Sequence, residues 1–379
     1  MPIDLTVPSL AALHERRSEK WSLHPGDVLS ATIAEMDYPL APTVTEALRA
    51  ALDRHDLGYA PPAPRGLREA FAGFAERRLK WTVDPDQVVL VPDVMIGLIE
   101  LCRVIAAPGE AVAFATPAYP PFFTTLPQAG VTLLEVGLNL DGALNSDQLD
   151  DALDAGARAL VLASPHNPTG RVLPVTELAA IAERCAERDV WVLADEIHAP
   201  LTLPGATHTP WLEVSDAARH RGVALTSASK AFNLAGLKAA LLVTASPAAR
   251  ELVARLPSLS DHSGLLGVIA AQAAFEGGDE WLDAVIEQLA RNRDRLAVDL
   301  AAQLPQVAHR PPQATFLAWL DCTALGLGEE PARTFLERGR VALGRGLDYG
   351  RPGAGHVRLN FATSPEHLSE IVSRMAGAV

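Results

Sequence analysis

The chain has 379 residues, of which 49% are hydrophobic and 21% are charged, and its formal net charge is −14 at pH 7. This length suits two domains, or one large α/β unit with an appendage, and supplies enough apolar residues for a sizeable core. The acidic balance disfavours non-specific binding to DNA, RNA or anionic membranes. We therefore expect neither a nucleic-acid partner nor a membrane partner.

The sequence also predicts the compartment. No apolar run approaches the about 20 residues that a membrane span needs, and the first residues lack the basic and then apolar pattern of a secretory signal. Cys102, Cys185 and Cys322 are too far apart for a zinc site or a disulfide framework, so no metal site is expected. We expect a cytoplasmic protein with reduced thiols.

Short apolar runs alternate with longer amphipathic stretches through the middle of the chain. The runs, which predict strands, are Gln87–Val91, Ala111–Ala115, Val131–Val136, Ala159–Ala163, Val190–Ala194, Val223–Thr226 and Ala239–Val243. Between several of them lie helical patterns such as Val175–Arg188. This alternation predicts an α/β fold with a mostly parallel sheet that is covered by helices on both faces.

The pattern changes after residue 264. Leu265–Phe275 predicts one helix, and Trp281–Leu304 predicts a long amphipathic helix with a continuous apolar stripe. Ala314–Leu320, Val341–Leu343 and His356–Phe361 predict short strands. The C-terminal part therefore indicates a second, smaller α/β layer.

Four candidate functional residues lie near the ends of such runs or in a predicted strand. Asn167, Asp195 and Lys230 follow three of the apolar runs, and Arg358 lies in a predicted strand near the C-terminus. A lysine buried at a strand end has a lowered pKa, which makes its amine a nucleophile for Schiff-base chemistry. Taken singly, the lysine also fits an exposed loop, the aspartate a helix N-cap and the asparagine an Asn-Pro turn. Together, in this order, they match what a pyridoxal-phosphate enzyme requires.

The motifs around these residues carry a resemblance to a known family. They are Ser-Pro-His-Asn-Pro-Thr-Gly at 164–170, Ala-Asp-Glu-Ile-His at 194–198, Ser-Ala-Ser-Lys-Ala-Phe-Asn at 227–233 and Val-Arg-Leu-Asn at 357–360. With them the chain resembles the aminotransferase superfamily of pyridoxal-phosphate enzymes, fold type I, and within it the cystathionine β-lyase-like carbon–sulfur lyases. The resemblance runs from Ile33 to the C-terminus. It implies a large cofactor-binding domain at 46–275 with a seven-stranded sheet, and a small domain made of 1–45 and 276–379.

The resemblance implies a role for each residue around the cofactor ring. Lys230 would bind pyridoxal 5'-phosphate through its amine and then act as the general base at the substrate Cα. Asp195 would keep the pyridine nitrogen protonated, which makes the ring an electron sink. Asn167 and His198 would donate to the phenolic oxygen, and Tyr119 would stack on the ring.

A second group is expected at the cofactor phosphate. The amides of Val94 and Met95 open a predicted helix, and Ser227 matches the family's hydroxyl ligand better than Ser229 does. Lys238 takes the place where classical aminotransferases have an arginine. Asp93 stands where many relatives have glycine, and we expect it to cap the helix and point away from the phosphate. Tyr59 resembles a tyrosine that reaches the phosphate of a neighbouring subunit, which implies a homodimer with shared active sites.

The substrate side is expected to use three further residues. Arg358 would hold the α-carboxylate of an amino acid as a bidentate pair. Asp37 and Tyr38 belong to a segment, Ile33–Tyr38, that resembles the substrate side of the lyases, although Glu35 replaces their usual aspartate.

The reaction is predicted from the resemblance rather than from the residues. Elimination from Cβ of cystathionine or another cysteine S-conjugate would release a thiol, pyruvate and ammonia, and the lyase-like motifs favour it. Transamination of an α-amino acid is the alternative, since it needs the same cofactor contacts. Related folds also serve as effector domains of transcription regulators, but only about 30 residues precede Ile33, too few for a DNA-binding module.

Overall fold

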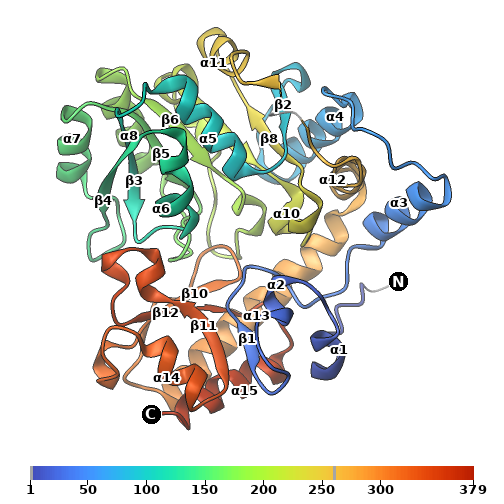
Figure 1. Cartoon of the computed structure of the whole chain (residues 1–379), viewed down its shortest axis with the longest axis vertical. Coiled ribbons are helices and arrows are strands. Elements are labelled where there is room, and N and C mark those ends of the chain that lie inside the picture. Colours follow the sequence, from blue (N-terminus) through green and yellow to red (C-terminus); the bar gives the residue numbers. More distant parts are fainter. Residues whose placement is uncertain (1–2, 259–261) are drawn as a thin grey trace.

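A seven-stranded sheet forms the centre of the larger part of the protein (Figure 1). The computed structural model describes residues 3–258 and 262–379. The strands are β2 (Val88–Val91), β3 (Ala111–Thr116), β4 (Thr132–Gly137), β5 (Ala157–Ala163), β6 (Trp191–Asp195), β7 (Gly222–Thr226) and β8 (Ala240–Val243). Their order in the sheet is β2-β8-β7-β6-β5-β3-β4, and β8 is antiparallel to β2 and β7, whereas the other pairs are parallel. Each predicted apolar run corresponds to one of these strands, which confirms the predicted sheet.

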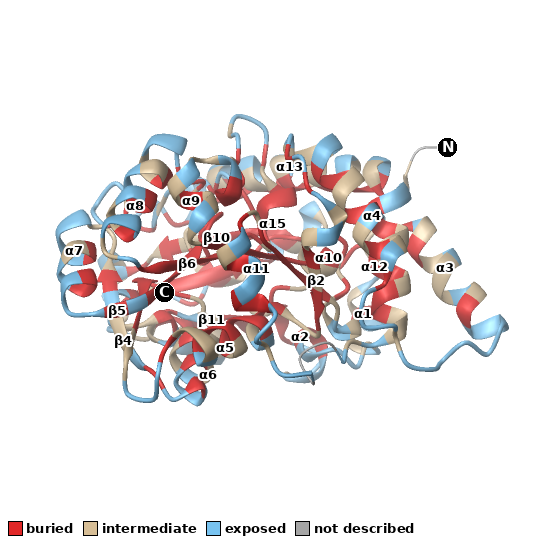
Figure 2. Ribbon diagram, turned by 90° about the horizontal axis from the view of Figure 1, so that it is seen from above, coloured by how far each residue is buried: buried red, intermediate tan, exposed pale blue. Residues whose placement is uncertain are grey.

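Helices cover both faces of this sheet. Along β5, Leu160 and Leu162 belong to one buried apolar cluster and Val161 to another, because successive side chains of a strand point to opposite faces. The first cluster includes side chains of α8 (Val175–Glu187), and the second includes side chains of α5 (Val94–Ile105). The buried strands therefore lie between two helical layers (Figure 2).

A five-stranded sheet forms the smaller part. Its strands are β1 (Leu29–Ala31), β9 (Ala308–His309), β10 (Leu317–Asp321), β11 (Val341–Arg345) and β12 (His356–Asn360), in the order β1-β11-β12-β10-β9. β1 pairs in parallel with β11, so the N-terminal segment joins the C-terminal sheet, as expected. The long helix α13 (Asp279–Gln303) packs against α15 (Pro365–Ala376) beside this sheet (Figure 1). The domain boundaries at 45/46 and 275/276 stay a prediction.

One predicted strand begins later than expected. The apolar run starts at Ala314, but β10 begins at Leu317. Thr315 has a φ of +66°, which an extended strand cannot contain. Ala314 instead forms an isolated bridge with Thr202, next to the loop that follows β6.

The remaining α-helices are all shorter than α13. They are α1 (Leu10–His14), α2 (Glu19–Ser22), α3 (Pro42–Asp53), α4 (Arg65–Phe74), α6 (Pro121–Thr125), α7 (Ser146–Asp154), α9 (Asp216–His220), α10 (Ala228–Ala231), α11 (Pro247–Val253), α12 (Leu265–Gly277) and α14 (Pro331–Glu337). Within the described ranges, no helix combines the length and the apolar character that a membrane crossing requires.

The parallel strands β5, β6 and β7 bring distant residues to one edge of the sheet. Ala163 at the end of β5 pairs with Asp195, and Asp195 pairs with Leu225 of β7. Because parallel strands end at the same edge, the loops carrying Asn167 and Lys230 meet there, beside Asp195. This edge faces the smaller part of the protein (Figure 1).

Candidate active site

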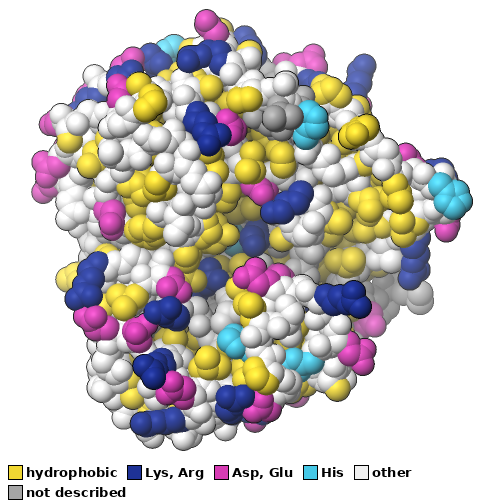
Figure 3. Space-filling view, in the orientation of Figure 1, with side chains coloured by type: hydrophobic (Ala, Val, Ile, Leu, Met, Phe, Trp, Pro, Cys, Tyr) yellow, Lys and Arg dark blue, Asp and Glu magenta, His cyan; other side chains and the backbone are white. Residues whose placement is uncertain are grey.

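A pocket of about 870 Å³ lies at this edge of the large sheet. The hollow is visible between the two parts of the molecule, with basic side chains inside it (Figure 3). The pocket is lined by nine of the predicted cofactor residues, namely Val94, Met95, Tyr119, Asn167, Asp195, His198, Ser227, Lys230 and Lys238. Residues from five separate stretches of the chain therefore meet at one place.

Lys230 lies on α10, a single helical turn after β7. The Ser227 side chain caps this turn by accepting a hydrogen bond from the Ser229 amide at 3.0 Å. The Lys230 amine donates to the Ala34 carbonyl at 3.0 Å. Burial, and then the positive charge of Arg358, lower the pKa of Lys230 to about 8. About a tenth of the amine is therefore the free base at pH 7, far more than for an ordinary lysine.

Asp195 and His198 line the same pocket as Lys230. Burial raises the pKa of Asp195 to about 6, while a hydrogen bond from the Ile197 amide and the charge of Lys230 act in the opposite direction. The carboxylate is therefore ionised at neutral pH. Burial lowers the pKa of His198 to about 3, so its ring is neutral. Its Nδ1 is buried and has no hydrogen-bond partner in the described part of the chain.

Arg358 lies in β12 and is only 5% exposed. Its Nη1 donates to Asn167 Oδ1 at 3.1 Å, and its Nη2 donates to the Thr32 carbonyl at 2.7 Å. The Tyr349 ring lies 5.1 Å from the guanidinium carbon, which is a cation–π contact. The guanidinium is thus held by neutral groups, without a carboxylate partner among the described residues. Arg358 itself does not line the pocket, but its hydrogen-bond partner Asn167 does, so its uncompensated charge lies directly behind the pocket wall.

The opposite wall contains the expected phosphate residues. Val94 and Met95 begin α5, and the first amides of a helix have no acceptor within it. Asp93 caps this helix through the Ile96 amide, as expected. Its other oxygen does not point away from the pocket, because it accepts from the Lys238 amine at 2.9 Å. This pair partly neutralises the carboxylate that would otherwise repel a phosphate.

The two tyrosines that were predicted at the cofactor, Tyr119 and Tyr59, differ in position. Tyr119 lines the pocket, packs edge-on against Phe122, and has a pKa raised by burial. Tyr59 is 97% exposed and does not line the pocket. Its expected phosphate contact needs a neighbouring subunit and stays a prediction.

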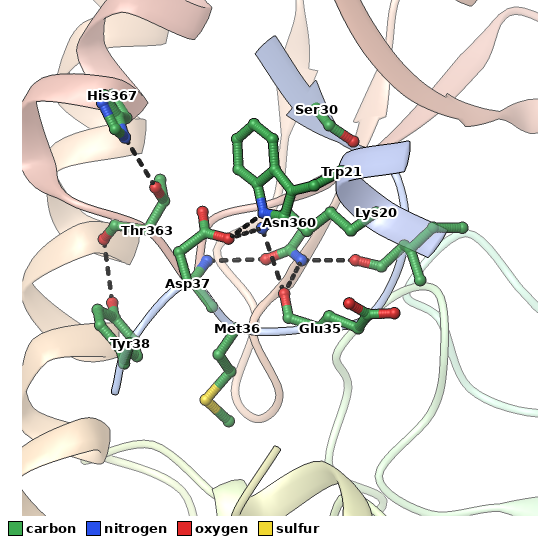
Figure 4. Close-up of polar contacts among 12 residues, drawn as sticks. Lys20, Trp21, Ser30, Glu35, Met36, Asp37, Tyr38, Asn360, Thr363 and His367 are labelled. Carbon is green, nitrogen blue, oxygen red and sulfur yellow. Dashed lines mark hydrogen bonds and ion pairs between the residues drawn. The ribbon is translucent and has the colours of Figure 1, made fainter. Parts of the chain in front are cut away.

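The side chains of Asp37 and Tyr38 do not line the pocket. Figure 4 shows Asp37 bonded to Lys20 and Trp21, and Tyr38 bonded to Thr363. Asp37 is 1% exposed and forms an ion pair of 2.9 Å with Lys20. Tyr38 is 2% exposed, and its hydroxyl donates to the Thr363 carbonyl. The structure therefore places both side chains inside the smaller part rather than on a substrate, because the backbone of their segment, and not these side chains, faces the pocket.

Sequence reasoning missed three contributors to the site. The carbonyls of Thr32 and Ala34 hold Arg358 and Lys230, and Tyr349 lies against Arg358. A backbone carbonyl has no residue-type signal, and Tyr349 ends the short 3₁₀ helix Gly346–Tyr349, which has no recognisable motif. Sequence reasoning did select the Ile33–Tyr38 segment as part of the site, but it expected the side chains of the segment, and not its backbone, to make the contacts.

Comparisons with known proteins identify a family and individual relatives. The model of the family "Aminotransferase class I and II" matches residues 27–375. A Mycobacterium leprae protein provisionally named cystathionine beta-lyase is 42% identical, covering 99% of this chain and 97% of its own. Cystathionine beta-lyase of Corynebacterium glutamicum is 34% identical, covering 99% and 100%. A crystal structure from Corynebacterium diphtheriae, provisionally described as a PLP-dependent beta-cystathionase, is 34% identical, has a TM-score of 0.94 and covers 99% of each chain.

Proposed function

The chain belongs to the class I and II aminotransferase family, and we propose that it is a pyridoxal-phosphate-dependent carbon–sulfur β-lyase. Its substrate is cystathionine or a related cysteine S-conjugate. We choose the lyase because of sequence identity to proteins named for cleavage of cystathionine. One such relative is 42% identical and another is 34% identical, each over nearly the whole chain. The pocket by itself suits transamination equally, because both reactions need the same cofactor contacts.

Pyridoxal 5'-phosphate is the cofactor, and the pocket residues fit it. The buried Nδ1 of His198 lacks a partner among the described residues, and such an atom is costly unless a ligand supplies one. We assign the phenolic oxygen to His198 and Asn167, the pyridine nitrogen to Asp195, and the ring face to Tyr119. The phosphate is assigned to the group Val94, Met95, Ser227 and Lys238. When bound, the cofactor accepts the electron pair that is left at the substrate Cα.

The chain's own residues bind the substrate and move its protons. Arg358 binds the α-carboxylate and orients the Cα–H bond. The Lys230 amine, whose pKa of about 8 leaves part of it as the free base, accepts the Cα proton. The Cβ–S bond then breaks and the sulfur leaves as a thiol after gaining a proton. Addition of one water to the remaining fragment gives pyruvate and ammonia.

Assembly and location are proposed on separate grounds. Tyr59 and Leu57 are 97% and 60% exposed between α3 and α4, which a contact with a second subunit would explain. We assign a homodimer in which Tyr59 completes the partner's phosphate site. A cytoplasmic location is supported by the buried free thiols Cys102, Cys185 and Cys322. Light scattering on the purified protein tests the dimer, and a monomer at micromolar concentration would exclude the shared site.

The decisive experiment separates the lyase from the transaminase. The purified, cofactor-loaded protein is incubated with L-cystathionine without any 2-oxo acid, and pyruvate and free thiol are measured. Equal amounts of both products support elimination. Absence of pyruvate, together with amino transfer after a 2-oxo acid is added, would instead identify an aminotransferase.

A further inference from the structure

Residues 32–37 supply backbone carbonyls to two cations of the active site, Lys230 and Arg358. The Ala34 carbonyl accepts from the Lys230 amine at 3.0 Å, and the Thr32 carbonyl accepts from Arg358 Nη2 at 2.7 Å. The segment follows β1 and contains no helix or strand. Its backbone makes one internal hydrogen bond, from the Glu35 amide to the Ile33 carbonyl at 2.9 Å, and one outside bond, from the Asp37 amide to the Ala362 carbonyl at 2.9 Å. Side chains from elsewhere supply its other contacts.

Two asparagines hold the segment from the active-site side. Asn360 Nδ2 donates to the Ile33 and Glu35 carbonyls at 2.6 and 2.7 Å. Asn233 accepts from the Met36 amide at 2.8 Å and donates to the Met36 carbonyl at 2.9 Å. One asparagine follows Arg358 by two positions and the other follows Lys230 by three, so the segment lies between the two halves of the site.

On its other side the segment is held by a buried ion pair (Figure 4). Lys20 Nζ lies 2.9 Å from Asp37 Oδ1 and also donates to the Glu35 carbonyl at 3.3 Å. Trp21 Nε1 donates to the same Asp37 oxygen at 2.9 Å. Both charged side chains are 1% exposed. Arg16 adds a bond from Nη2 to the Asp37 carbonyl at 3.1 Å.

Burying two charges costs desolvation energy that their attraction often does not recover, so such a pair is weak evidence for a purely stabilising role. Here one charged group, Asp37, belongs to the segment and the other, Lys20, bonds to it twice, and neither side chain lines the pocket. The Lys20 amine joins the Asp37 side chain to the Glu35 carbonyl, which restricts the backbone directly after Ala34.

We propose that Lys20 and Asp37 are positioning residues, which fix residues 32–37 so that Ala34 and Thr32 orient Lys230 and Arg358. Helix α2 is thereby part of the machinery that binds the substrate carboxylate, although it lies outside the pocket. The inference rests on the proposed carboxylate-binding role of Arg358. It does not depend on whether the reaction is elimination or transamination.

The test is Lys20→Met, which keeps the length of the side chain and removes its charge. The probe is 3-(methylthio)propionate, a thioether carboxylate without the α-amino group, whose binding is followed by the change it causes in the absorption of the bound cofactor. We expect its dissociation constant to rise about tenfold, and KM for L-cystathionine to rise more than kcat falls, because the carboxylate site is loosened. All variants are measured well below their unfolding midpoints.

Two further variants separate positioning from stability. Arg340→Met breaks the more exposed ion pair between Arg340 and Asp27 in the same part of the protein, and should leave the probe's affinity unchanged. Lys20→Met/Asp37→Leu replaces the buried pair by apolar groups, a change that commonly restores stability. We expect the double variant to regain thermal stability without regaining probe affinity.

The outcomes are distinct. Wild-type probe affinity in folded Lys20→Met, or recovery of affinity together with stability in the double variant, would overturn the positioning role. If Arg358→Ala leaves the probe's affinity unchanged, the proposed carboxylate site is wrong instead. Failure of the lyase assay alone leaves the probe titration valid, so the two proposals are tested separately.

Discussion

Replacing Arg358 by alanine tests the proposed substrate site most directly. The guanidinium is 5% exposed and its hydrogen-bond partners are the neutral acceptors Asn167 Oδ1 and the Thr32 carbonyl. A substrate carboxylate would exchange at least one of these for a charged acceptor. Hydrogen bonds to charged groups contribute about 1.5–3 kcal/mol each, and two of them, reduced by the bond to Asn167 that is lost, leave about 1.5–3 kcal/mol. We therefore expect kcat/KM to fall about 10- to 10²-fold in Arg358→Ala.

The same substitution changes the acid–base behaviour of Lys230. The positive charge of Arg358 helps to hold the pKa of Lys230 at about 8, so its removal raises that pKa. Less free base is then present at neutral pH, and the alkaline shift of the rate profile reports it. Arg358→Lys is the matched control, because it keeps the charge but loses the planar fork. It should retain the wild-type pH profile while KM stays raised.

The assay is the initial rate of pyruvate release from L-cystathionine, measured for the three proteins between pH 6.5 and about 9.5, the range that spans the expected Lys230 titration. Cofactor content is measured in parallel from absorbance. A KM in Arg358→Ala within about threefold of the wild type would refute the assignment, since a lost ion pair of this kind costs more. Loss of cofactor from the variant would place Arg358 at the cofactor rather than at the substrate.

Further predictions concern the pocket walls and the stability of the fold. Lys230→Ala should abolish the absorption band of covalently attached cofactor, and Asp195→Asn should lower kcat about 10²- to 10³-fold while the cofactor stays bound, the usual cost of losing one electrostatic stabiliser; an unchanged band or an unchanged kcat contradicts these roles. Lys238→Ala should weaken cofactor binding about tenfold in an absorbance titration, because it removes a point charge and leaves Asp93 unpaired, whereas Asp93→Asn should strengthen it. For His198, burial lowers the folded-state pKa to about 3 from the ordinary 6.5, so its contribution to stability is present above pH 6.5 and is lost as pH falls toward 3; the melting temperature should drop between pH 7 and pH 4, and less steeply in His198→Asn.

Much of the fold followed from local pattern. Runs of Val, Leu and Ala such as those of β5 and β6 are buried on both faces, which only a covered parallel sheet provides, and each was predicted within two residues of its observed bounds. The start of β10 was not predictable, because Thr315 adopts a left-handed backbone that its residue type does not signal. The cofactor side of the pocket was also predictable, because residues that end neighbouring parallel strands must meet at one edge.

The sequence by itself thus determined the strands, the helices and the meeting of Asn167, Asp195 and Lys230. Only the tertiary structure decided how the polar atoms pair. Asp37 was expected at the substrate, yet it pairs with Lys20, and the carbonyl of Ala34, 196 residues from Lys230, accepts from the Lys230 amine. The physical reason is that apolar periodicity reports which residues leave water, whereas the partner of a buried polar atom depends on the three-dimensional approach of segments far apart in the chain.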